Sequence, residues 1–495
     1  MCVPKPLLLP HPLFFFATLA DLTEHVQMKR RGFIPNVRTY ATMMSGYANV
    51  DDWGSLTKQL ELVHSIYGQL KQHLERARNV VDDPAGDSGT PFILYPIALY
   101  ISILGKAGMY QRAFDVFHEL DTDGPLAPDP KIYSSLLRVL ADRACPVSAD
   151  ADAAPDPEAI AQSVSDAKYV WRRHMRSLDK RPLHAIEPRA VDAMVKILSR
   201  GTPSDHELMF DILRDVCGLP RPDEQQTQPS QQKKQVKVPP TEWIISETLD
   251  GCIAAGRPDV AVHYAQSVMD TRRLHPILRA RHLHKLLRAH ILLAKQEGEK
   301  NKEEGEGSPS PLPSRAENAA AWVEWMLAQV SRSKKATPNE HSLVYALELC
   351  YRCRDMPSAL RIARAMLRSG ALPVHAHAPG ARGTPLVKVW AWEYLFRLAT
   401  AAPPDEQRQC LELLDRYGSS VLDVWESRSA VERMPPAEKK TNEYLARHIL
   451  QVAQTVPLSP DHEGTEDPDA AGHKAWSDIR RRAETFLKRT HGRKG

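Results

Sequence analysis

One pattern limits what this chain of 495 residues can fold into: a proline followed by asparagine or aspartate, and then a helix-like run, recurs along it. The pairs are Pro35-Asn36, Pro128-Asp129 and Pro338-Asn339. After each pair, apolar residues recur at i, i+3, i+4 and i+7, which indicates a helix with one apolar face. A second helical segment follows after a break. Because two such helices cannot bury both apolar faces alone, each pair must stack on its neighbours.

Further helical segments fill much of the chain. A well-formed copy of the pattern spans 94–120, and the copy that begins at Pro338 continues to Pro373. Less regular helical segments are predicted at 158–178, 188–198, 205–216, 241–255, 259–269, 277–294, 387–400, 405–417 and 442–452. Aromatic residues make up only 7% of the chain, and runs rich in Ala, Leu, Arg and Glu favour helix over sheet. The expected fold class is therefore all-α.

Three polar stretches interrupt these helices. Residues 145–157 are rich in Ala, Asp and Pro, 220–240 in Gln, Lys and Pro, and 296–314 in Glu, Lys, Gly and Ser. Such compositions bury too little apolar surface to offset the entropy of ordering, so we expect disordered insertions. The parts that they separate are N-terminal repeats (1–144), degenerate repeats (158–219 and 241–295), a further repeat region (315–430) and C-terminal helices with a basic tail (431–495).

Composition and the N-terminal sequence limit the class of protein. A net charge of +4 is too small to indicate nucleic-acid binding by itself, and seven cysteines without disulfide-like spacing indicate free thiols in a reducing compartment. The apolar residues before Ala17 are interrupted by prolines and too few to span a membrane, and no Arg-rich transit peptide is evident. Residues 17–32 read as the second helix of a repeat without its first, so we expect the sequence to begin inside a repeat array.

The repeats resemble a known family. The Pro-Asn or Pro-Asp start, an aromatic residue near the fourth helical position, the turn at Lys106 to Gly108 and a spacing of roughly 35 residues are similar to pentatricopeptide repeats, which form organellar RNA-binding proteins. The tetratricopeptide signature W-x-x-L-G-x-x-Y is absent. The resemblance covers 32–140 and 338–373. It implies a right-handed α-solenoid of stacked helix-turn-helix repeats, of the fungal or eukaryotic mitochondrial type.

The resemblance also implies which side chains contact RNA. The base-reading position of the first helix falls on Ala41, Ala98, Ser134 and Val344. Its partner at the repeat end falls on Asp129, and the neighbouring positions that lie between bases fall on Arg38, Tyr95, Lys131 and His341. Of the four base-reading residues, only Ser134 can hydrogen-bond a base edge. Either RNA is held mainly by backbone charge and stacking, or some repeats contact protein instead.

Basic residues gather in three places. Arg281, Lys285 and Arg288 are spaced to form one stripe of a helix. A second cluster comprises Arg172, Arg173, Arg176, Lys180 and Arg181, and the tail from Arg480 to Lys494 is the third. Such stripes suit RNA phosphates, and solvated helix faces carry the same charges equally often, so both interpretations remain open.

Residues suited to catalysis or metal binding are sparse. Cys350 and Cys353 lie inside a predicted helix without a second pair of ligands at zinc-site spacing, so we expect no metal and no cofactor. The deaminase signature of RNA-editing proteins is incomplete, and no phosphate loop or nucleophile motif occurs, so we expect no enzyme. Four clustered aromatic residues are interpreted as packing residues rather than as base-stacking ones: Trp390, Trp392, Tyr394 and Phe396.

Two functions follow as alternatives. The first is a single-stranded RNA-binding factor that acts without catalysis in mitochondrial RNA processing, stability or translation, together with RNA-processing proteins or the mitochondrial ribosome. The second is a mitochondrial ribosome-associated or assembly scaffold that binds mainly protein. A face lined by cations would favour RNA, and one lined by apolar and acidic groups would favour protein.

Overall fold

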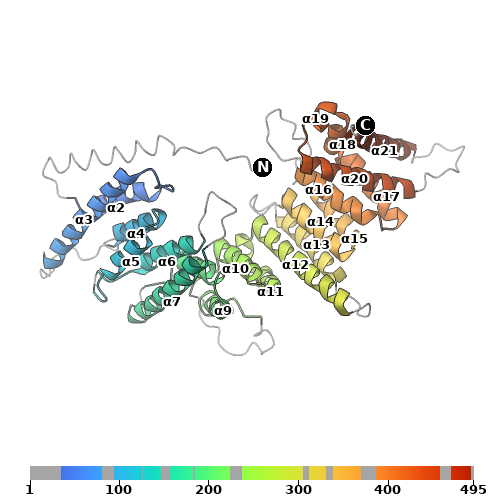
Figure 1. The fold of residues 1–495 in the computed structure, drawn as a ribbon. Helices are drawn as coiled ribbons and strands as arrows, with labels where there is room; N and C mark the ends of the chain where they lie inside the picture. Colours follow the sequence, from blue (N-terminus) through green and yellow to red (C-terminus); the bar gives the residue numbers. More distant parts are fainter. Residues whose placement is uncertain are drawn as a thin grey trace. The chain divides into compact units, whose positions relative to one another are not determined.

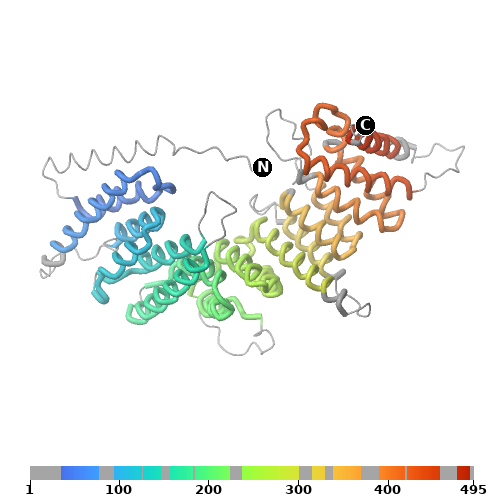
Figure 2. The backbone as a smooth tube through the Cα atoms, viewed as in Figure 1, coloured from blue at the N-terminus to red at the C-terminus, as the bar shows by residue number. Residues whose placement is uncertain are grey.

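The structure of the chain is a computed structural model (Figure 1). It describes residues 35–80, 94–124, 126–145, 156–181, 184–222, 237–304, 312–329, 338–368, 386–456 and 470–491. Within these ranges every regular element is a helix, and successive helices pack on one another in pairs. The predicted all-α class of stacked helical repeats is confirmed. The chain divides into two compact units, Met1–Ala255 and Gly256–Gly495, and each can be followed by colour in Figure 2.

The first unit alternates two kinds of helix, which we call the first and second helices of each repeat. The first helices pack side by side in chain order: α2 (Val37–Ala48), α4 (Tyr95–Lys106), α6 (Pro130–Ala144), α8 (Pro188–Leu198) and α10 (Glu242–Ala254). The second helices pack against them: α3 (Thr57–Val80), α5 (Tyr110–His118), α7 (Pro157–Lys180) and α9 (Pro203–Cys217). The core therefore runs continuously between neighbouring pairs, as the repeat pattern predicts.

The recurring Pro-Asn and Pro-Asp pairs begin the first helices. Asn36 Oδ1 accepts a hydrogen bond from the Thr39 amide at 3.0 Å, and Asp129 Oδ1 accepts one from Ile132 at 2.9 Å. In the second unit Asn339 Oδ1 accepts from the Ser342 amide at 3.2 Å. Each side chain thus satisfies an amide that the first turn leaves without a partner, which is worth about 1 kcal/mol.

The turn predicted at Lys106 to Gly108 is also present. Gly108 has φ of +73°, and the Met109 amide returns to the Leu104 carbonyl at 2.8 Å, which ends α4. One turn earlier, Gly105 allows α4 and α6 to approach closely, because a Cβ at this position would overlap the Val139 side chain. The spacing of these two first helices therefore depends on a glycine.

The second unit continues with first and second helices. Its first helices pack in order: α12 (Ala280–Glu304), α14 (Glu340–Cys353), α16 (Leu386–Ala399) and α20 (Pro436–Thr455). The remaining elements are α11 (Pro258–Asp270), the 3₁₀ helix η2 (Arg272–Ile277), α13 (Leu312–Gln329), α15 (Met356–Arg368), α17 (Pro404–Tyr417), α18 (Ser419–Glu426), α19 (Arg428–Arg433) and α21 (Ala470–His491). Of these, α13, α15 and α17 form a second row, and α21 packs on α17, α18 and α20.

Parts of two predicted insertions are ordered elements. Helix α12 continues to Glu304, beyond the expected boundary at residue 296. At the end of 220–240, Val238 is buried, and its amide donates to the Val216 carbonyl at 3.0 Å. Helix α13 begins at Leu312, inside the third predicted insertion, whereas residues 146–155, 223–236 and 305–311 and the predicted helix at 17–32 lie outside the described residues. Among the helices that are described, none combines the length and the hydropathy that crossing a membrane requires.

Candidate nucleic-acid interface

The side chains predicted to lie between bases form a row across the first helices of the first unit. Arg38 is exposed near the start of α2, and Lys131 of α6 places Nζ 4.8 Å from the centroid of the Tyr95 ring on α4. Arg189 and Trp243, each the second residue of its helix, extend the row onto α8 and α10, and both are exposed. The sequence analysis did not identify these two, because the degenerate repeats lack the Pro-Asn signal.

The base-reading positions lie deeper than their neighbours. Ala98 is 3% exposed, Ser134 5% and Val344 8%, so all three side chains are packed among the helices, and Ala41 is half-buried. Asp129, the predicted partner at the repeat end, caps α6. Small or β-branched side chains at these positions suit close packing of neighbouring first helices. Their base-reading role remains a prediction, and the accessible groups are those of the row beside them.

The predicted cluster at Arg172 and Arg173 lies on α7, a second helix. The Arg173 guanidinium lies 4.6 Å from the centroid of the Phe117 ring of α5, and Arg172 Nε donates to the Lys168 carbonyl at 3.1 Å. Further along α7, Lys180 pairs with Asp123 at 3.0 Å, and Arg181 donates to the Gly124 carbonyl at 3.1 Å. Arg173, Lys180 and Arg181 therefore join α7 to α5 and to the loop after it, and the role of this cluster in binding RNA phosphates stays a prediction.

The stripe at Arg281, Lys285 and Arg288 lies on α12, a first helix of the second unit. Arg288 is exposed, whereas Arg281 and Lys285 are half-buried. Between them, His284 Nε2 lies 2.7 Å from Ser342 Oγ of α14, and its ring centroid lies 6.3 Å from that of His341. Burial lowers the pKa of His284, a hydrogen bond that Asn339 accepts from the ring opposes this, and the charge of His341 lowers the pKa further. The α12–α14 contact thus carries a neutral imidazole at neutral pH.

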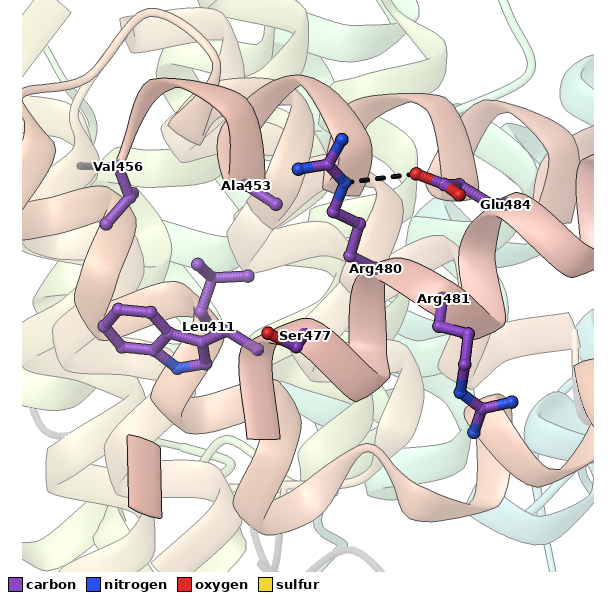
Figure 3. Close-up of a pocket in the computed structure, with 8 residues that line it drawn as sticks. Leu411, Ala453, Val456, Ser477, Arg480, Arg481 and Glu484 are labelled. Atoms are coloured by element: carbon purple, nitrogen blue, oxygen red, sulfur yellow. Dashed lines mark hydrogen bonds and ion pairs between the residues drawn. The ribbon is translucent and has the colours of Figure 1, made fainter. Parts of the chain in front are cut away.

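Three consecutive arginines of α21 pair with carboxylates of the same unit. Arg480 pairs with Glu484 at 3.1 Å, Arg481 with Glu426 at 3.3 Å and Arg482 with Asp423 at 3.1 Å. Arg480 and Arg481 border a cavity of about 340 Å³ whose floor includes Leu411 and Val456 (Figure 3). This part of the predicted basic tail holds α21 against α18 rather than presenting an array of uncompensated charge.

The second unit also contains a group of half-buried and exposed aromatic and basic side chains on α14, α16 and α20. The Arg397 guanidinium lies 4.5 Å from the centroid of the Tyr351 ring, and the ring centroids of Tyr351 and Tyr394 are 6.0 Å apart. Trp390, one turn before Tyr394, is 41% exposed, and its Nε1 donates to Thr441 Oγ1 of α20 at 3.2 Å. We call this group the aromatic array; its members are Tyr351, Trp390, Tyr394 and Arg397, together with Lys440 and Tyr444 of α20.

The aromatic array continues along α20. Tyr444, one turn after Thr441, is 45% exposed, and Lys440 Nζ lies 5.9 Å from its ring centroid. The sequence analysis interpreted Trp390 and its neighbours as packing residues. That interpretation is correct for Trp392 and Phe396, which are buried, and wrong for Trp390. Helical spacing alone could have separated them, because Trp390 and Tyr394 share one face of α16 and Trp392 and Phe396 share another.

The cysteines contribute to packing. Cys350 and Cys353 are both buried in α14, and burial raises the pKa of the Cys353 thiol to about 11. The six cysteines within the described ranges are all free thiols. Among the described residues, no three His, Cys, Asp or Glu side chains are grouped as metal ligands would be.

Comparisons with known proteins give limited similarity. Neither a protein-family model nor a curated protein sequence matches the chain. Two crystal structures of the pentatricopeptide repeat protein PPR10 with an 18-nt psaJ RNA element, one of a triple cysteine-to-serine variant, are similar to it at 15% sequence identity and a TM-score of 0.29. Each alignment covers 86% of this chain and 57% of the matched chain, so this chain spans little more than half of their length. By its own helices, the chain is a helical-repeat protein.

Proposed function

We propose that the chain binds single-stranded RNA without catalysis, and that the aromatic array is a principal contact. The observation that carries the proposal is the grouping of Arg397 with the rings of Tyr351 and Tyr394, on helices that also present the exposed rings of Trp390 and Tyr444. Aromatic rings stack on the faces of bases, and guanidinium and ammonium groups attract phosphates. The row of side chains across the first helices of the first unit, which we call the second-position row, includes Arg38, Lys131, Arg189 and Trp243. It offers the same two kinds of group, a cation and an aromatic ring.

This mode of binding explains why three of the four predicted base-reading positions lack polar side chains. Stacking needs no hydrogen bond to a base edge, so Ala41, Ala98 and Val344 are compatible with a contact that tolerates many sequences. The affinity would then depend strongly on salt, because phosphate contacts release counterions. From the family resemblance of its repeats, we place this binding in mitochondrial RNA processing, stability or translation.

Binding can be tested with purified full-length protein and a fluorescein-labelled single strand of about 20 nucleotides. We expect anisotropy to show binding that weakens steeply between low and physiological salt, and Arg397→Gln to weaken it about fivefold and to reduce the slope against log salt by about 0.7. Arg368→Gln, which changes an exposed arginine on the second helix α15, is the matched control and should leave the affinity unchanged. Equal affinities of both variants would refute the contact at the aromatic array.

One observation favours the alternative of a protein-binding scaffold. The first helices α6, α8 and α10 carry acidic residues among their basic ones: Lys196 lies 3.7 Å from Asp142, and burial together with the charge of Glu247 raises the pKa of Asp192 to about 6. Such a mixed surface repels phosphates as well as attracting them. Crosslinking of the tagged protein in its native cells decides between the two: discrete organellar RNA footprints support the RNA-binding factor, and co-purified ribosomal proteins without footprints support the scaffold.

A further inference from the structure

The first unit contains a cavity away from the second-position row. Its volume is about 490 Å³, within the range of about 300–1,000 Å³ that is usual for ligand sites. It is formed by α5, by the C-terminal end of α6 and by the N-terminal half of α7. Two of these three elements are second helices, so the cavity belongs to a different surface from the proposed RNA contacts.

Aromatic side chains form one side of this cavity. Tyr110, Phe114 and His118 follow one another at intervals of four residues along α5, so they share one face of the helix. The His118 ring lies 6.2 Å from that of Phe114 and 6.1 Å from that of Tyr169 on α7. Tyr169 is itself one of the few large apolar side chains that are exposed among the described residues. The ring faces that line the cavity attract cations.

Carboxylates form the other side. Asp156 caps the N-terminus of α7, Glu158 and Asp166 come from its N-terminal half, and Arg143 of α6 is the single arginine or lysine among the described residues of the lining. Asp166 Oδ2 lies 3.7 Å from Arg143, a distance longer than a hydrogen bond, and Oδ1 accepts from Gln162 at 2.9 Å. Burial raises the pKa of Asp166 despite both contacts. The cavity therefore has excess negative charge that Arg143 does not balance.

Arg143 shows how this cavity accommodates a guanidinium. Its Cζ lies 5.5 Å from the centroid of the Tyr110 ring, and its Nη1 faces the Asp166 carboxylate. Phe114 and Glu158 present a second aromatic ring and a second carboxylate in the same cavity. A planar guanidinium suits this combination better than an ammonium, because it stacks on a ring while its fork of donors meets a carboxylate.

We propose that this cavity, between α5 and α7, binds an arginine side chain of a partner protein. The proposal concerns a protein partner and does not depend on RNA binding at the first helices. The chain's own segment between α6 and α7 does not complement the cavity, because residues 146–155 contain Asp150 and Asp152 and no lysine or arginine. The excess of carboxylates over cations in the described lining favours a basic segment of another polypeptide as the occupant.

The test uses the full chain and a fluorescein-labelled peptide of alternating arginine and glycine. We expect saturable binding that Glu158→Lys weakens about tenfold and Phe114→Leu about threefold, consistent with the loss of one charge contact and one cation–π contact. Asp179→Lys makes the same charge change at an exposed position near the other end of α7 and should leave the affinity unchanged. Because Glu158 is exposed, Glu158→Gln provides a milder variant that retains the fold.

Three further measurements make the outcome decisive. A peptide with citrulline in place of arginine should not bind, and one with lysine should bind several-fold more weakly. Equal losses in Glu158→Lys and Asp179→Lys, equal affinity for the lysine peptide, or no binding of the arginine peptide would each overturn the proposal. RNA affinity of Glu158→Lys, measured in parallel, should equal that of the wild type, so that failure here is distinguishable from failure of RNA binding.

Discussion

Lys131 of α6 lies over the ring of Tyr95 of α4, with 4.8 Å between Nζ and the ring centroid. The two residues occupy corresponding places in consecutive repeats, and the stacking of first helices brings them together. A cation beside a ring on neighbouring first helices provides a surface for a phosphate and a base. A similar pair occurs in the aromatic array, where Arg397 lies over Tyr351.

Replacement of the exposed indole of the aromatic array tests stacking directly. Trp390→Ala removes a ring that is 41% exposed, and we expect the affinity for single-stranded RNA to fall about tenfold, since stacking on one base is worth about 1–3 kcal/mol. Leu62→Ala removes an exposed apolar side chain from a second helix of the first unit and serves as the control. Fluorescence anisotropy measures both, and a Trp390→Ala protein with wild-type affinity would contradict base stacking at this residue.

Asp129 is expected to act on stability through its cap. Asp129→Ala removes the acceptor for the Ile132 amide and should lower the free energy of unfolding by about 1 kcal/mol, whereas Asp129→Asn retains the acceptor and should cost much less. Urea unfolding followed by circular dichroism measures the difference. If Asp129→Asn were as unstable as Asp129→Ala, the carboxylate charge rather than the cap would be responsible.

The close approach of α4 and α6 makes Gly105 intolerant of a side chain. Gly105→Ala should destabilise the first unit by about 1–3 kcal/mol, because its Cβ would overlap Val139. Val139→Ala creates space at the same point, so the double variant should recover most of the loss due to Gly105→Ala. A double-mutant cycle of urea unfolding gives the interaction free energy between the two substitutions. If the losses in the free energy of unfolding were additive, the two positions would not be in contact.

The stability of the first unit should decrease in mild acid because of His174. This imidazole is fully buried, its ring centroid lies 4.5 Å from that of Tyr133, and burial, with a smaller effect of His184, lowers its pKa to about 4. The unfolded chain binds the proton near pH 6.5, so the contribution of His174 is complete above that pH. It is lost at about 1.4 kcal/mol per pH unit as the pH falls from 6.5 towards 4.

His174→Phe keeps an aromatic ring and removes the titration. Its melting temperature should therefore fall less than that of the wild type between pH 7.5 and pH 5.5. His118→Asn, which changes an exposed histidine, should retain the wild-type dependence on pH. Parallel pH profiles of the wild type and His174→Phe would exclude His174 as the source.

Arg489 should act on stability and not on RNA binding. Its Nη1 donates to the carbonyls of Trp425 at 2.9 Å and Glu426 at 2.7 Å, which end α18. Arg489→Met keeps much of the apolar stem and removes both bonds, so we expect a loss of about 1–3 kcal/mol in the free energy of unfolding. The RNA affinity of Arg489→Met, measured at temperatures below the unfolding transition, should equal that of the wild type. A large loss of RNA affinity would show that the basic tail contacts RNA.

The local signals in the sequence predicted many of the helices, but not α13, α18 and α19, and placed the start of α20 at residue 442 rather than at Pro436. Pro-Asn and Pro-Asp pairs marked three starts that the caps at Asn36, Asp129 and Asn339 confirm. These features depend on residues within one turn of each other, so neighbours in sequence determine them. The same local character explains why the buried Trp392 and Phe396 were correctly interpreted as packing residues.

Only the tertiary structure decided which charged and aromatic side chains share a surface. Arg173 packs on Phe117 of α5, and Arg482 pairs with Asp423 of another helix, although the sequence alone places both residues in basic clusters. Trp390 meets Thr441, which is 51 residues away, and becomes part of an exposed array. Sequence by itself determined the repeat, because helix periodicity and caps are local. The composition of each surface depends on how the helices pack, because residues that are distant in sequence decide which charges are paired and which rings stay exposed.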